Sequence, residues 1–192
     1  MPLMESLKSL DRNVLLFING KRHPVLDIIM FWVSNRWIWI PFYAFLLGLT
    51  VRIFAKKTVM VILTAGVLIT ITDQGSVHLF KNIFHRLRPC HNPQIASLIR
   101  LTGDCGGQYG FISSHSANVF ALAMFMTFIL RHRIRYLPLI MFGWATLVSY
   151  SRIYNGVHYP ADIAAGALWG MATGYAAAKI LSYFITISGH DK

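Results

Sequence analysis

Long apolar runs recur along this chain, and polar or cationic residues separate them. A helix needs roughly 20 apolar residues to cross the hydrocarbon core of a bilayer, and only helices and closed barrels satisfy their backbone hydrogen bonds there. The sequence therefore predicts an all-α, polytopic bundle of five transmembrane helices. The five runs cover about residues 37–54, 58–80, 114–130, 136–151 and 160–182.

The N-terminal segment, residues 1–36, is apolar only in shorter stretches. Val14–Ile18 and Val25–Val33 are separated by Lys21 and Arg22, and neither stretch is long enough to span a bilayer. We expect amphipathic helices that lie at the membrane interface. If this segment crosses the membrane instead, the bundle has six spans.

Composition agrees with a membrane location. The chain is 55% hydrophobic and 13% charged, whereas a soluble domain carries roughly 25% charged residues. A net charge of +11 would suggest nucleic acid as the partner of a soluble chain, but here the cations cluster at the ends of apolar runs, as membrane topology requires. We therefore expect anionic lipids, and not nucleic acid, as partners.

The positions of the cations also predict the orientation of the bundle. Lys56, Lys57 and the basic run 131–135 fall at one side of the membrane, which the positive-inside rule makes cytoplasmic. The intervening loops then lie on the outer side. Three polar stretches distant in sequence meet there: Lys81–Pro89, Ser113–Ser116 and Ser151–Asp162.

The stretch Ser151–Asp162 lies between two apolar runs and places an arginine, a histidine and an aspartate within twelve residues. Pro160 suits the first position of a helix, so that Asp162 falls in its first turn, where a carboxylate is favoured. His158 lies four residues before this carboxylate, which can accept a ring N–H and orient the imidazole. With Arg152 nearby, this arrangement suits attack on a phosphate. The alternative is an interfacial helix cap with incidental charges.

The other two polar stretches carry weaker signals. Lys81 and Arg88 are seven residues apart, which on a helix makes both point the same way; the alternative is a pair of cations that extend to the interface at a helix end. Ser113 is a candidate helix N-cap, where backbone N–H groups bind phosphate oxygens. His115 could donate a proton, or it is an interfacial histidine bonded to a loop.

Together the three stretches resemble the signature of the type 2 phosphatidic acid phosphatase (PAP2) superfamily: K-x6-R-P, P-S-G-H and S-R-x5-H-x3-D. The first and third motifs match at every defined position, while Ile112 and Ser114 replace the usual proline and glycine of the second. The resemblance covers about residues 58–182. The matching residues are Lys81, Arg88, Pro89, Ser113, His115, Ser151, Arg152, His158 and Asp162.

The resemblance implies a single PAP2-like domain over residues 1–192, with residues 37–182 as its catalytic bundle. It implies that His158 attacks phosphorus to form a phosphohistidine, that Asp162 orients its ring, and that His115 protonates the leaving oxygen. No metal or other cofactor is implied, because cations supply the positive charge. The implied phosphate-binding residues are Lys81, Arg88, Ser113, Ser114 and Arg152.

The expected function is metal-independent hydrolysis of a lipid phosphate or pyrophosphate: undecaprenyl pyrophosphate, phosphatidylglycerol phosphate, phosphatidic acid or a lipid A phosphate. The small size favours a bacterial enzyme of the inner membrane, with its site facing the periplasm or exterior. Two alternatives are a non-catalytic protein that binds or transports lipids, and a lipid phosphotransferase.

Two cysteines, Cys90 and Cys105, fall in the long outer loop. An oxidising compartment would preserve a disulfide between them. The alternative is two free thiols, which is expected if this side of the membrane is cytosolic.

Overall fold

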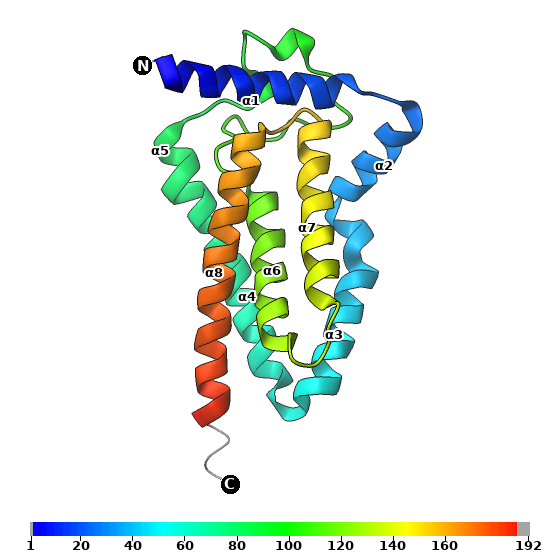
Figure 1. Ribbon diagram of the computed structural model, residues 1–192, viewed down its shortest axis with the longest axis vertical. Coiled ribbons are helices and arrows are strands. Elements are labelled where there is room, and N and C mark those ends of the chain that lie inside the picture. The colour runs from blue at the N-terminus through cyan, green and yellow to red at the C-terminus, as the bar shows by residue number, and fades with distance from the viewer. Residues whose placement is uncertain (1, 188–192) are drawn as a thin grey trace.

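A computed structural model describes residues 2–187, and all the long elements in this range are helices (Figure 1). The prediction of an all-α fold is confirmed. The long helices are α1 (Pro2–Gly20), α2 (Pro24–Ser34), α3 (Ile40–Phe54), α4 (Thr58–Gly75), α6 (Ser114–Leu130), α7 (Leu137–Tyr154) and α8 (Pro160–Ile187). The short helical segments are η1 (Arg36–Trp39), η2 (Ala55–Lys57), η3 (Ser76–Lys81, a π-helix), α5 (Asn82–Phe84), η4 (Pro89–His91) and η5 (Ala96–Leu98).

The helices from α3 onward follow the five apolar runs of the sequence. The continuous helical stretch Arg36–Phe84 is long and apolar enough to cross a bilayer, and it turns back on itself near Ala55–Lys57 (Figure 1). Large apolar side chains also face outward, such as Leu139, which is 75% exposed, and Leu63 and Leu168. An apolar outer surface of this kind is suited to lipid.

Helix α1 lies across one end of the bundle, nearly perpendicular to the long helices (Figure 1). Its residues Leu15 and Asn19 are buried, whereas Leu7, Leu10 and Phe17 are exposed. One face thus contacts the bundle and an apolar face remains outside, as expected for a helix at the membrane interface. Helix α2 differs from that expectation, because it packs against α7 and leads into α3.

Helices α6 and α8 pack along a row of glycines at four-residue spacing. Side-chain atoms added at Gly170 and Gly174 would overlap the α6 backbone, and a Cβ at Gly166 would lie 2.6 Å from the Ser113 carbonyl oxygen. Small residues of this kind let helix backbones approach closely in membranes. The close contact at Gly166 fixes the start of α6 against the start of α8.

Candidate active site

The three polar stretches meet at the end of the bundle that α1 covers. The Lys81 ammonium, on the last residue of the π-helix η3, donates a hydrogen bond of 2.6 Å to the Ser114 hydroxyl at the start of α6. The backbone N–H of Ser113 donates to the Asp162 carbonyl at the start of α8, at 3.0 Å. These two bonds join the first stretch to the second and the second to the third.

The prediction that Lys81 and Arg88 share one helix is wrong. Helix α5 ends at Phe84, and His85 adopts a left-handed conformation with φ 46°. Arg88 is extended, with φ −64° and ψ 156°, because a residue before a proline is driven out of the helical region. Arg88 reaches the site from a loop, where its guanidinium donates to the Cys105 carbonyl at 2.9 Å.

A disulfide joins Cys90 and Cys105. It closes the loop that follows Arg88, and the carbonyl group of Cys105 is the one that accepts the hydrogen bond from Arg88. The disulfide therefore helps to hold this cation in place.

His158 and Asp162 form a buried pair. The ring nitrogen Nδ1 of His158 lies 3.4 Å from Oδ2 of Asp162, and the same oxygen accepts the Tyr159 backbone N–H at 3.0 Å. His158 is only 1% exposed and Asp162 is fully buried. The carboxylate faces Nδ1 and thereby directs the opposite nitrogen, Nε2, away from itself.

The His158 ring belongs to the loop between α7 and α8 and carries no charge at neutral pH. Burial, followed by the positive charges of Arg88 and Arg152, holds the pKa of His158 well below its ordinary value of 6.5. A neutral imidazole has a free lone pair, which a nucleophile requires. The same cations that would bind a phosphate thus help burial to keep the ring uncharged.

This shift predicts the pH dependence of the reaction. If His158 is the nucleophile, as the PAP2 resemblance implies, its protonation stops the reaction, so kcat/KM should fall only as the pH drops well below 6.5. Arg88→Gln removes a positive neighbour, which should raise the pKa of His158 and move this acidic limb to higher pH, whatever its effect on the maximal rate. Profiles of kcat/KM from about pH 4 to 8 measure the limb. If the acidic limb fell at the same pH in the variant as in the wild-type protein, the limb would belong to a group other than His158.

Arg86 and Asp11 belong to the site but were not predicted. The Arg86 guanidinium donates to Oδ1 of Asp162 at 2.8 Å and to Oδ2 of Asp11 at 2.6 Å. The other oxygen of Asp11 accepts the Ala161 backbone N–H at 2.8 Å. Helix α1 therefore contributes a carboxylate that fixes both Arg86 and the first turn of α8, and through them Asp162.

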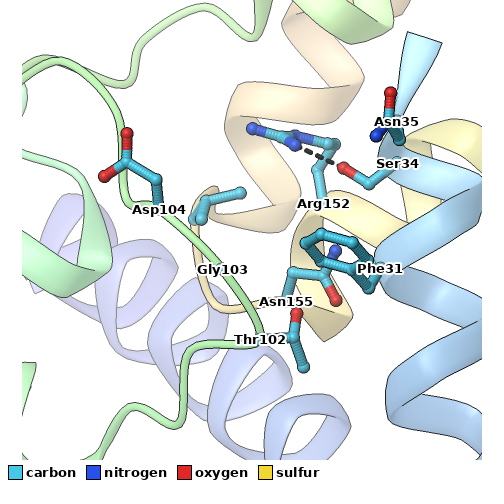
Figure 2. A pocket seen from close by; sticks show the side chains of 9 residues that line it. Phe31, Ser34, Asn35, Thr102, Gly103, Asp104, Arg152 and Asn155 are labelled. Atoms are coloured by element: carbon cyan, nitrogen blue, oxygen red, sulfur yellow. Dashed lines mark hydrogen bonds between the residues drawn. The ribbon is translucent and has the colours of Figure 1, made fainter. Parts of the chain in front are cut away.

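Three other residues that the sequence predicts for the site are Ser113, His115 and Arg152. The Ser113 hydroxyl caps α6 by accepting the Ser116 N–H at 3.4 Å. His115 is the second residue of α6, and its ring lies near enough to Arg152 and His158 for their charges to act on it. The Arg152 guanidinium donates a hydrogen bond to the Ser34 hydroxyl of α2, and it also lines a cavity of about 180 Å³ (Figure 2).

Comparison with known proteins assigns this arrangement to a family. The family model for the PAP2 superfamily matches residues 57–185. The chain is 35% identical over 182 residues to a lipid A 4'-phosphatase of Porphyromonas gingivalis. This alignment covers 94% of the chain and 76% of the relative. It is 37% identical over 187 residues to a lipid A 4'-phosphatase of Bacteroides thetaiotaomicron, in an alignment that covers 95% of this chain and 80% of that relative.

Two solved structures share the fold. LpxE of Aquifex aeolicus superposes with a TM-score of 0.66 at 26% identity, over 88% of this chain and 95% of that one. A PAP2-type phosphatidylglycerolphosphate phosphatase of Bacillus subtilis superposes with a TM-score of 0.64 at 19% identity, over 94% of this chain and 87% of that one.

Proposed function

The chain belongs to the PAP2 superfamily, and we propose that it hydrolyses a phosphate monoester of lipid A through a phosphohistidine intermediate. It is a lipid phosphatase, and its similarity to two lipid A 4'-phosphatases over more than three quarters of their length supports the choice of substrate. The buried pair of His158 and Asp162, surrounded by cations, is the observation that carries the mechanism.

In the first step, Nε2 of His158 attacks phosphorus as the bond to the lipid oxygen breaks. Asp162 stabilises the positive charge that develops on the ring, and His115 gives its proton to the departing oxygen. In the second step, water attacks the phosphohistidine. His115 takes a proton from that water, the P–N bond breaks, and inorganic phosphate leaves.

Three cations would stabilise the charge on the transferring phosphoryl group. The positive charges of Lys81, Arg88 and Arg152 each help to lower the pKa of His158, which supports placing them around the phosphorus that His158 attacks. Fixed positive charge at such a position lowers the barrier to phosphoryl transfer. Backbone N–H groups near Ser114, in the first turn of α6, add donors for the phosphate oxygens.

We place the active end at the periplasmic face of a bacterial inner membrane. Helix α1 and the long loop lie at this end, whereas the η2 turn and the loop between α6 and α7 lie at the other (Figure 1). Those two turns carry Lys56, Lys57 and the basic run 131–135, which the positive-inside rule keeps cytoplasmic. The Cys90–Cys105 disulfide suits an oxidising compartment.

Phosphate release from purified lipids tests this function. The protein in detergent, with a chelator present, is given a lipid A phosphate, phosphatidylglycerol phosphate, phosphatidic acid or undecaprenyl pyrophosphate. We expect the highest kcat/KM with the lipid A phosphate. Release from none of the four would favour a lipid-binding or transport protein, and transfer of the phosphate to an added alcohol in place of water would favour a phosphotransferase.

The role of His115 predicts a dependence on the leaving group. His115→Ala should slow the release of a lipid alkoxide by about 10²-fold or more, because that oxygen needs a proton as it departs. Nitrophenolate is a good leaving group, so the defect should shrink when p-nitrophenyl phosphate is the substrate. Equal losses of kcat/KM on the two substrates would contradict the role of a general acid.

A further inference from the structure

Lys81 is held by a chain of hydrogen bonds between the end of α4 and the start of α6. Its ammonium donates to the Ser114 hydroxyl at 2.6 Å, and this hydroxyl lies 2.5 Å from the hydroxyl of Ser76. Ser76 is fully buried, and it donates to the Asp73 backbone carbonyl at 2.7 Å. The chain therefore runs from the cation through two hydroxyl groups to a carbonyl oxygen.

The direction of each bond follows from the number of protons. A serine hydroxyl has one proton to donate, and the proton of Ser76 goes to the Asp73 carbonyl. The Ser114 hydroxyl must then donate to Ser76 while it accepts from Lys81. Its single proton is used within the protein, so none is left for a phosphate oxygen. An ammonium has three donors, so Lys81 keeps others for a ligand.

The π-helix η3 brings both partners of Ser114 to the same side. Ser76 is the first residue of η3 and Lys81 is the last, and a π-helix pairs residue i with residue i+5. Both side chains reach Ser114, the first residue of α6. One turn further along α6, the Asn118 amide donates to Oδ1 of Asp73 at 3.2 Å. This second polar contact fixes α4 against α6 next to the chain of hydrogen bonds.

We propose that the Ser114 hydroxyl is a positioning group, which holds the Lys81 ammonium where the substrate phosphate binds and does not itself contact the phosphate. This inference rests on the proposed function, in which Lys81 is one of the phosphate-binding cations. A lysine side chain is long and flexible, and a donor that is already in place needs no reorganisation when the reaction occurs. The glycine that is usual at this position of the motif has no hydroxyl, so the contact is a departure of this chain from the usual motif.

Ser114→Ala tests the proposal, because alanine is well tolerated in a helix and the change removes only the hydroxyl. We expect the variant to bind inorganic phosphate about 3- to 10-fold more weakly than the wild-type protein does, since Lys81 loses its anchor. The rise of the thermal unfolding midpoint with phosphate concentration, for the protein in detergent, measures this affinity without turnover. A folded variant with the phosphate affinity of the wild-type protein would overturn the proposal.

The same change in a Lys81→Met background decides whether the hydroxyl acts through the lysine. Each single change should weaken phosphate binding, but Ser114→Ala should cause no further loss once the cation is gone. A loss of the same size in both backgrounds would overturn the proposal, because the hydroxyl would then bind the phosphate itself.

Thr173→Val is the matched control. The Thr173 hydroxyl lies 3.0 Å from the Thr72 hydroxyl, so it joins α8 to α4 by a bond of the same kind that does not involve Lys81. Its loss should lower the unfolding midpoint and leave the phosphate affinity unchanged. A loss of phosphate affinity as large as that of Ser114→Ala would attribute both effects to helix packing and would exclude the positioning role.

Phosphate affinity also separates this proposal from the proposed function. A protein that releases phosphate from none of the lipids, but loses phosphate affinity on Ser114→Ala only when Lys81 is present, would keep the positioning role and lose the proposed reaction. A protein that hydrolyses a lipid phosphate but binds inorganic phosphate equally well with and without the Ser114 hydroxyl would lose the positioning role alone.

Discussion

Replacing His158 with asparagine is expected to abolish turnover, with a loss in kcat on the order of 10⁴-fold or more. The amide of asparagine cannot form the P–N bond that the reaction requires. It is polar and can still donate to Asp162, so the buried site keeps a hydrogen bond. Phosphate release from a lipid A phosphate measures the loss, and the thermal unfolding midpoint shows whether the variant is folded.

Lys56→Ala is a suitable control for this change. Lys56 is an exposed cation in the η2 turn at the opposite end of the bundle, so its loss should leave kcat nearly unchanged. A His158→Asn variant that folds and retains turnover comparable to this control would exclude His158 as the nucleophile.

Trapping of the intermediate identifies the nucleophile directly. Wild-type protein mixed with radiolabelled substrate and quenched in alkali should carry a phosphoryl group that is lost in acid, which is the behaviour of a phosphohistidine. The His158→Asn protein should carry none. Label that is retained in the variant, or that survives acid, would assign the intermediate to another residue.

The sequence predicted those parts of the fold and site that depend on neighbours along the chain. Ser113 caps α6 and Pro160 begins α8, as expected from local backbone preferences. His158 lies beside Asp162 because only the turn into α8 separates them. The apolar runs fixed the extents of the long helices, because burial in lipid demands apolar side chains over a defined length.

Contacts between distant segments could not be predicted in this way. Arg86 meets Asp11 across 75 positions of sequence, and Arg152 meets Ser34 across 118. Such pairs depend on how the loops and α1 fold over the end of the bundle, for which a single sequence carries no periodic pattern. The glycine row 166, 170 and 174 was not predicted either, although a four-residue spacing of small residues is a pattern that indicates a close helix contact.

Asp162→Asn is expected to have the second largest effect, a loss in kcat on the order of 10³-fold. Both carboxylate oxygens accept hydrogen bonds: Oδ1 accepts from Arg86, and Oδ2 accepts from the Tyr159 N–H and lies next to the His158 ring. Asparagine must therefore turn its NH₂ group toward a donor in either orientation. The imidazole then loses both its fixed orientation and the negative charge that stabilises its cationic form.

The same change should also destabilise the fold, by about 1–3 kcal/mol, because a buried donor loses its acceptor. Asp27→Asn is the control: Oδ1 of Asp27 accepts both from Arg22 at 3.0 Å and from the Tyr154 hydroxyl at 2.7 Å, so asparagine keeps an acceptor but loses the charge that pairs with Arg22, and neither bond involves His158. That variant should lose stability while retaining most of its kcat. Asp162→Asn is compared directly with this control: a lower unfolding midpoint with nearly wild-type kcat would contradict the prediction. Asp162 would then serve the fold alone, and His158 would need no carboxylate to attack phosphorus.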